Sequence, residues 1–235
     1  MRILKSFIHK FGRWYCNEIC RLEFFHQSFI RINERPIELS FVFRQLMQTC
    51  PQKVLDVGTG TTALPHVIRN CGFLVTATDN VKDYWPSGMF NRHYYVMNDD
   101  ITNTRINDRY DFISCVSVLE HVEAYDKAIT NMFKLLQPNG HLLLTFPYNE
   151  NQYVPNAYKL PGAVLYGRDD PSTCQIFSRN EINRWLEHDQ GRIVEQEYWQ
   201  FWEGEFWRCG SQILPPLQVD KHKRHQLTCL LIQKT

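Results

Sequence analysis

The chain has 235 residues, 43% of them hydrophobic, and its 26 basic side chains nearly balance its 25 acidic ones, which gives a formal net charge of +1. These values fit one medium-sized globular domain and exclude a disordered or fibrous chain. Because the net charge is close to zero, no global field attracts nucleic acid, and no nucleic-acid partner is expected.

The cysteines and the apolar runs indicate where such a chain resides. Its eight cysteines include no CxxC pair, so we expect reduced, mostly buried thiols in an intracellular, cytoplasmic protein. Charged or turn residues interrupt every apolar run before it reaches the roughly 20 residues of a membrane span. Residues 1–15 also lack the continuous apolar segment of a signal peptide.

Residues 1–50 have a helical pattern. Apolar side chains recur at helical spacing from Ile3 to Phe11 and from Leu22 to Ile32, and Pro36 suits the first turn of a further helix over about residues 37–48. We predict an N-terminal helical cap over residues 1–50 that covers the ligand cleft of the following domain. Because the first helix is basic and amphipathic, contact of residues 1–15 with a membrane surface is the alternative.

From residue 51 the pattern changes to short apolar runs that alternate with helical stretches. The runs span residues 54–57, 73–78, 93–97, 112–116 and 141–146, and a helix with one apolar face lies between Ala128 and Leu136. This alternation is typical of βα units around a mostly parallel sheet. We therefore predict a doubly wound α/β domain over residues 51–235.

The last third of the chain interrupts and then completes this pattern. Residues 147–177 are rich in turn and aromatic residues and are too many for a simple loop, so we predict an insertion there. Ser178 and Glu181 have the spacing of a capping box, and the apolar runs 193–201 and 227–232 predict two further strands. The aromatic residues between positions 199 and 207 are expected to fill core, with the wall of an acceptor pocket as the alternative.

A glycine turn follows the first strand, in the stretch Asp56-Val57-Gly58-Thr59-Gly60. Glycines there let backbone N–H groups approach a ligand closely, and a helix N-terminus follows. Nineteen residues after Gly60 the second strand ends at Asp79, where a carboxylate can accept hydrogen bonds from a ribose diol. The two features in this order predict a site for a ligand that contains a nucleoside.

Two classes of ligand fit the turn. Residues 58–63 satisfy the dinucleotide pattern GxGxxG/A, which is typical of an NAD(P)-dependent oxidoreductase. Asp56 favours the other class, because a carboxylate at the turn is unfavourable beside a pyrophosphate and favourable beside an ammonium group.

With these features the sequence resembles the class I S-adenosylmethionine-dependent methyltransferases over roughly residues 50–150. Matching phrases are residues 56–60, Asp79, Asp100-Ile101, residues 110–113 and Leu119-Glu120-His121. The resemblance implies a Rossmann-like, mostly parallel sheet of seven strands whose last two form an antiparallel pair. It also implies S-adenosyl-L-methionine as cofactor and S-adenosyl-L-homocysteine as product.

The resemblance also implies a set of cofactor-binding residues: Asp56, Gly58, Thr59, Gly60, Asp79, Asn80, Asp100, Ile101 and Ser117. Asp56 would serve the ammonium group, Asp79 the ribose, and Asp100 with Ile101 the adenine. Thr62 departs from the family, which often has a third glycine there.

His121 and Tyr148 are the candidate catalytic residues. If the phrase after the fourth strand begins a helix, Ser117, Glu120 and His121 share one face beside the cofactor. His121 then either packs beneath the cofactor or acts as a general base. Some family members hold a metal at this place, but Ser117 replaces the first ligand, so no metal is expected. Tyr148 is either an acceptor-side residue or a loop anchor.

The predicted activity is methyl transfer from S-adenosylmethionine to an O, N or C atom of a small or medium-sized organic acceptor. The alternatives are an NAD(P)-dependent oxidoreductase and a catalytically silent S-adenosylmethionine-binding protein. The sequence leaves the identity of the acceptor and the oligomeric state open.

Overall fold

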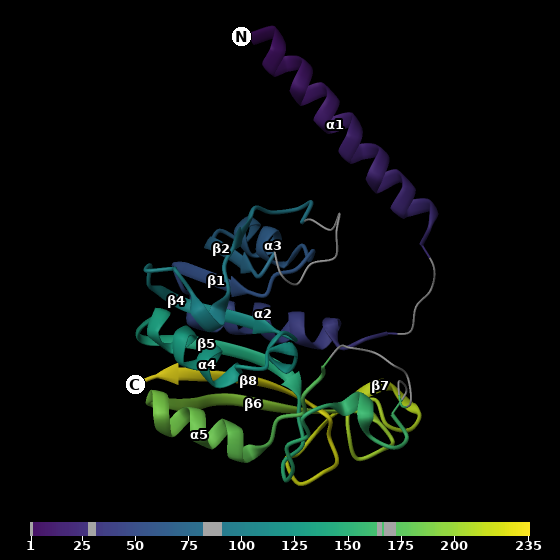
Figure 1. Ribbon diagram of the computed structural model, residues 1–235, viewed down its shortest axis with the longest axis vertical. Helices are drawn as coiled ribbons and strands as arrows, with labels where there is room; N and C mark the ends of the chain where they lie inside the picture. Colours follow the sequence, from purple (N-terminus) through teal and green to yellow (C-terminus); the bar gives the residue numbers. More distant parts are fainter. Residues whose placement is uncertain (1, 28–31, 82–90, 164–165, 167–172) are drawn as a thin grey trace. The chain divides into compact units, whose positions relative to one another are not determined.

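The computed structural model describes residues 2–27, 32–81, 91–163, 166 and 173–235 (Figure 1). The chain forms two compact units, Met1–Pro36 and Ile37–Thr235. Helix α1 (Arg2–Phe25) belongs to the first unit, and helix α2 (Arg35–Thr49) places nearly all of its residues in the second. Helix α2 packs on the sheet through Phe41, Val42 and Leu46, and the domain boundary expected at residue 50 stays a prediction.

The second unit is built on one sheet, whose described part has eight strands in the order β3-β2-β1-β4-β5-β8-β6-β7. In chain order the strands are β1 (Lys53–Val57), β2 (Leu74–Asp79), β3 (Val96–Asn98), β4 (Tyr110–Val116), β5 (Leu136–Pro147), β6 (Gly191–Trp202), β7 (Gln212–Val219) and β8 (Leu227–Lys234). Strands β1 to β5 pair in parallel, and β8 is antiparallel to both β5 and β6. The doubly wound, mostly parallel α/β fold is confirmed.

The seven strands implied by the resemblance are all present, and β6 and β8 are its antiparallel pair. Strand β7 is an eighth strand, which pairs with β6 at the edge of the sheet. It contains Pro215 and Pro216. Because proline cannot donate to a strand ladder, such a segment fits an edge and does not look like a strand in the sequence.

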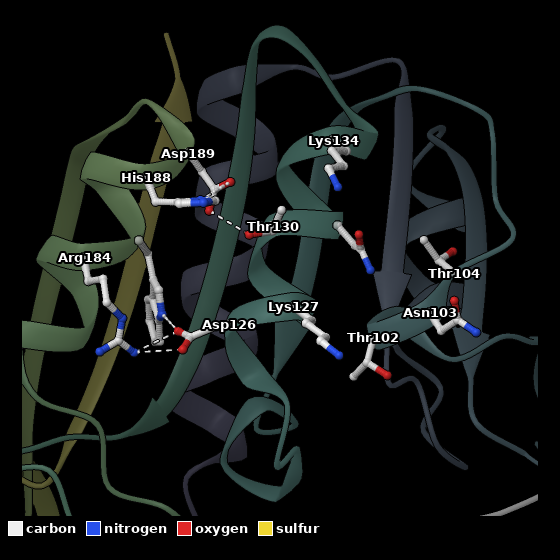
Figure 2. A pocket seen from close by; sticks show the side chains of 12 residues that line it. Thr102, Asn103, Thr104, Asp126, Lys127, Thr130, Lys134, Arg184, His188 and Asp189 are labelled. Atoms are coloured by element: carbon white, nitrogen blue, oxygen red, sulfur yellow. Dashed lines mark hydrogen bonds and ion pairs between the residues drawn. The ribbon is translucent and has the colours of Figure 1, made fainter.

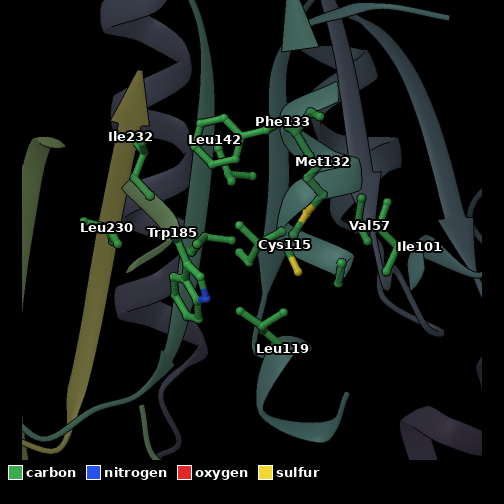
Figure 3. Packing of buried hydrophobic residues seen from close by; sticks show 14 of the residues in the cluster. Val57, Ile101, Cys115, Leu119, Met132, Phe133, Leu142, Trp185, Leu230 and Ile232 are labelled. Carbon is green, nitrogen blue, oxygen red and sulfur yellow. The ribbon is translucent and has the colours of Figure 1, made fainter. Parts of the chain in front are cut away.

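Helices cover both faces of the sheet. The side chains of β4 alternate between the two: Phe112 and Val116 pack with α2 and α3 (Leu64–Asn70), whereas Ile113 and Cys115 pack with α4 (Tyr125–Leu135) and α5 (Arg179–Asp189). Figure 3 shows the second cluster, in which Met132 and Phe133 of α4 and Trp185 of α5 meet the sheet. This alternation follows from the two-residue period of a strand.

Several local predictions are confirmed in detail. Helix α5 begins at a capping box, in which Ser178 and Glu181 satisfy each other's backbone donors. Pro36 lies in the first turn of α2. Asn139 has a φ of 62°, a conformation that asparagine adopts more readily than most residues.

The insertion folds back on the sheet. Isolated bridges pair Tyr148 with Phe177 and Val154 with Ile176, and the 3₁₀ helix η3 (Ala157–Lys159) lies between them. Residues 164–165 and 167–172 of the predicted insertion lie outside the described residues. Phe201 and Trp207 are buried in the same cluster as Val154 and Ile176, which supports core filling for these aromatic residues.

The cysteines are all free thiols, and four of them are buried: Cys115, Cys174, Cys209 and Cys229. The other four are exposed, so the prediction of mostly buried thiols holds for half of them. None of the helices within the described ranges has both the length and the apolar character that a membrane span requires.

Candidate active site

The glycine turn lies where the carboxyl ends of β1, β2 and β4 meet. Strands β2 and β4 flank β1 on opposite sides, so the strand order reverses at this point, which is where open α/β sheets bind ligands. The amides of Gly58 and Thr59 both donate to the carbonyl of Thr78 at the end of β2, at 2.8 and 3.1 Å. The turn is thus held against the neighbouring strand by its own backbone.

Asp56 anchors this turn from inside the sheet. Its side chain is 2% exposed, and its two carboxylate oxygens accept hydrogen bonds from Ser114 Oγ and Thr59 Oγ1, both at 2.7 Å. Buried charges are tolerated where such partners are present. The predicted contact of Asp56 with an ammonium group stays a prediction, and the geometry gives this residue and Thr59 a structural role in the turn.

The two glycines meet different surroundings, although both have positive φ, 72° for Gly58 and 57° for Gly60. A Cβ atom on Gly58 would lie 2.4 Å from Cγ2 of Val118, whereas a Cβ atom on Gly60 would meet no atom of the described residues within 4 Å. Gly58 therefore allows the turn to pack closely against the loop after β4. The space over Gly60 is open, as a ligand cradle requires.

Asp79 lies beside that open space. It is partly buried, and its Oδ2 accepts a hydrogen bond from the Gly60 amide at 2.7 Å. A carboxylate offers about four acceptor positions, so the same group can also receive the hydroxyls of a ribose. Asn91 steadies the turn from the other side, because its Nδ2 donates to the carbonyls of Gly60 and Thr62 at 3.0 and 2.8 Å. Nothing in the sequence pattern pointed to Asn91.

The predicted adenine residues follow β2 and β3. Asn80 is partly buried directly after Asp79, and Ile101 is 9% exposed in the 3₁₀ helix η1 (Ile101–Asn103). Asp100 is exposed and caps η1 through the Thr102 amide at 2.8 Å. The preceding Asp99 instead accepts hydrogen bonds from Thr104 Oγ1 and the Arg105 amide, and it thereby anchors the loop.

Ser117 lies at the end of β4 with a φ of 49°. Its Oγ donates at 2.5 Å to Oε1 of Glu38, a fully buried residue of α2 that also receives Thr145 Oγ1 at 2.7 Å. The condition for a shared helical face of residues 117, 120 and 121 is not met, because the backbone of Ser117 is left-handed and the short 3₁₀ helix η2 covers Leu119–His121. The sequence did not point to Glu38, because no local pattern links it to residue 117.

His121 has a defined orientation at the carboxyl edge of the sheet. Its Nδ1 lies 2.5 Å from the carbonyl oxygen of Thr173, and its Nε2 lies 3.8 Å from Oε1 of Glu120. Because a carbonyl only accepts, Nδ1 carries the proton in the neutral ring and Nε2 carries the lone pair. The side chain is 31% exposed, so the ring can be reached from outside.

Tyr148 is fully buried directly after β5. Its hydroxyl donates to Glu150 Oε2 at 2.8 Å, and its ring stacks on His225 with a centroid distance of 5.5 Å. Burial raises the pKa of Tyr148 well above its usual value, so the hydroxyl stays protonated at neutral pH. The catalytic role of Tyr148 stays a prediction, and these contacts favour the alternative of a loop anchor.

A separate pocket of about 520 Å³ lies between α4, α5 and η1 (Figure 2). Its polar walls include the ion pair between Arg184 and Asp126 at 2.8 Å and the hydrogen bond between Thr130 and Asp189. None of the residues predicted for the cofactor lines it, so it is distinct from the glycine turn.

The residues at the turn fit a cofactor that combines an adenosine with a sulfonium amino acid. The site has an open space over Gly60, the Asp79 carboxylate at the end of β2, and the exposed Asp100 side chain at the start of η1. A family model described as a methyltransferase domain matches residues 26–196, well over half of the chain. The chain belongs to this family.

Relatives and solved structures agree with this assignment. The methyltransferase is 26% identical over 172 residues to the ubiquinone biosynthesis O-methyltransferase of Coxiella burnetii, covering 68% of this chain and 71% of that protein. It is 29% identical over 146 residues to the enzyme of the same name from Vibrio atlanticus, covering 57% and 62%.

Two solved structures share the fold. One is an S-adenosylmethionine-dependent methyltransferase from Clostridium acetobutylicum, with a TM-score of 0.55, 14% identity and coverage of 97% of this chain and 98% of that one. The other is the 1,6-didemethyltoxoflavin-N1-methyltransferase of Burkholderia thailandensis, with a TM-score of 0.56, 14% identity and coverage of 97% and 90%.

Membership of the family decides between the two classes of ligand. The protein is a class I S-adenosylmethionine-dependent methyltransferase, and S-adenosylhomocysteine is its product. The cofactor supplies a methyl group on a positively charged sulfur, which is already a good leaving group. The chain therefore has mainly to align the acceptor and exclude water.

Proposed function

We propose that the methyltransferase transfers the methyl group to a phenolic hydroxyl of a small aromatic acceptor, with His121 as general base. The observation that carries the proposal is the contact of 2.5 Å between His121 Nδ1 and the Thr173 carbonyl oxygen, from which we infer that Nδ1 carries the proton and Nε2 the lone pair. The curated relatives named as O-methyltransferases support oxygen as the atom that receives the methyl group.

The acidity of the acceptor decides whether this histidine is useful. A phenol has a pKa of about 10 and an imidazole one of about 6.5, so proton transfer becomes favourable as the oxygen acquires its bond to carbon. Water has a pKa of about 15.7. A hydroxyl group of similarly high pKa would transfer its proton to an imidazole far less readily than a phenol does. Glu120, 3.8 Å from Nε2, stabilises the imidazolium that results.

The cofactor assignments of Asp79, Asp100, Ile101 and Asn80 are part of this proposal. The hydrogen bond from Gly60 to Asp79 orients the carboxylate for the ribose. Asp100 is exposed at the start of η1, where it is accessible to an adenine amino group.

The test is methyl transfer from labelled S-adenosylmethionine to a series of substituted phenols, followed by mass spectrometry. His121→Gln should lower the rate about 10²- to 10⁴-fold for phenols that are neutral at the assay pH. The loss should shrink for more acidic phenols, because these are already ionised and need no base.

Two controls make the result specific. His222→Gln changes an exposed histidine of the loop before β8 and should leave all rates unchanged, and S-adenosylhomocysteine should bind the His121→Gln variant as tightly as the wild type. An equal loss for neutral and ionised phenols would show that His121 is structural. Transfer to amines alone would reject the phenolic acceptor.

A further inference from the structure

Helix α1 lies outside the part of the chain that matches the methyltransferase family, since the match begins at residue 26. It is a continuous helix of 24 residues (Figure 1), or about 36 Å at 1.5 Å per residue. The catalytic unit and its family therefore offer no reason for the composition of this helix.

One side of α1 is mainly apolar and aromatic. The side chains concerned recur at intervals of three and four residues, and they are Leu4, Phe7, Ile8, Phe11, Trp14, Tyr15, Ile19, Leu22 and Phe25. That interval places them on one face. Phe7 is 67% exposed and Phe11 is 57% exposed, and the Phe11 ring lies 5.7 Å from that of Trp14.

The basic residues Lys5, Lys10 and Arg13 lie at helical positions outside this face. The first 17 residues contain Arg2, Lys5, Lys10 and Arg13 and no acidic residue. The first acid, Glu18, lies on the apolar face four residues after Trp14, and it pairs with Arg21 at 2.9 Å, so that the pair adds no net charge. A positive side next to an apolar side complements a surface that is negative outside and apolar just beneath.

We propose that α1 binds the surface of a bilayer that contains anionic lipid, lying in its plane with the apolar face in the acyl boundary. Basic helices with Phe, Trp and Leu on one face bind membranes in this way. Trp14 and Tyr15 suit the interface because their rings are apolar with a polar edge. Four cations within 17 residues exclude a spanning orientation for the same segment.

Co-sedimentation of the full chain with vesicles tests the proposal. The wild type should bind vesicles of phosphatidylcholine with phosphatidylglycerol and bind vesicles of phosphatidylcholine alone far less. Lys10→Gln with Arg13→Gln should lower binding to the anionic vesicles roughly 30-fold, because each cation contributes about 1 kcal/mol near such a surface. Failure of the wild type to bind anionic vesicles would overturn the proposal.

A matched pair of double variants tests the apolar face. Phe11→Gln with Trp14→Gln should reduce vesicle binding at least 10-fold, by analogy with the ~1.5–3 kcal/mol gained on burying a large apolar side chain. Ser6→Gln with Asn17→Gln changes exposed polar positions and should have no effect. In addition, the difference in emission between wild type and Trp14→Phe should shift to shorter wavelength when anionic vesicles are added.

Two other outcomes would assign the helix to a different partner. If the Phe11 and Trp14 changes weaken binding of S-adenosylhomocysteine and leave vesicle binding intact, α1 is a cap over the cofactor site. If they convert a dimer to a monomer in light scattering without changing vesicle binding, the face binds a second copy of the chain.

Discussion

Gly58 and Gly60 form a natural pair for measuring how tightly the turn must pack. Both have left-handed backbone, so replacement by alanine costs each about 1–2 kcal/mol in conformation. Alanine also lowers the conformational entropy of the unfolded chain, which stabilises each variant by about 0.4–1 kcal/mol. These two contributions are nearly equal at the two positions, and only the contact with Val118 differs.

That contact sets the expected difference in stability. The new methyl at position 58 would lie 2.4 and 2.5 Å from the two γ carbons of Val118, whereas the one at position 60 meets none of the residues that the structure describes. Overpacking of this kind costs about 1–3 kcal/mol. Gly58→Ala should therefore lower the free energy of unfolding by about 1–3 kcal/mol more than Gly60→Ala does.

Urea unfolding of the two variants measures this difference, and a double variant identifies its source. Adding Val118→Ala removes both γ carbons and should recover most of the additional loss in Gly58→Ala. The same change in the Gly60→Ala background should recover nothing. Equal stabilities for the two glycine variants, or no recovery with Val118→Ala, would refute the packing argument.

Two further predictions concern buried polar groups. Glu38→Gln keeps an oxygen for the Ser117 and Thr145 hydroxyls and should change the free energy of unfolding by less than about 1 kcal/mol. Glu38→Ala should lower it by about 2–4 kcal/mol, because each unsatisfied buried group costs about 1–3 kcal/mol. Equal losses for the two variants in thermal melts would contradict this prediction. Burial lowers the pKa of His225, so below pH ~6.5 the unfolded chain takes up a proton that the folded chain refuses, and stability should fall with falling pH. His225→Gln should flatten that fall in urea titrations, and an unchanged slope would rule out His225 as its source.

The sequence predicted the part of the site that is local. The glycine turn follows β1 and Asp79 ends β2, and the parallel pairing of these two strands brings the turn and the carboxylate together. The five βα strands follow from apolar runs in the same way. In these regions neighbours in the sequence are also neighbours in the fold.

What the sequence missed depends on contacts between distant residues. Glu38 reaches Ser117 across 79 positions, and Thr173 orients His121 across 52, and neither distance leaves a periodic signal. The apolar face that α2 packs on the sheet has the same sequence pattern as the face of a separate cap, so the sequence does not distinguish the two. The backbone of Ser117 is left-handed although the residue is not glycine, so its sequence does not show whether a helix begins there.

We propose that the open turn over Gly60 and the carboxylate of Asp79 together bind the cofactor. Titration calorimetry with S-adenosylhomocysteine tests it most directly. The wild type should bind, and Asp79→Ala should weaken binding at least 10-fold, since a hydrogen bond to a charged group contributes about 1.5–3 kcal/mol. Asp79→Asn, which keeps an acceptor for the Gly60 amide, separates loss of the ribose contact from collapse of the turn.

Asp108→Ala, which removes an equal charge from an exposed loop, should bind as the wild type does. No heat of binding from the wild type, or the same affinity after Asp79→Ala, would contradict the account.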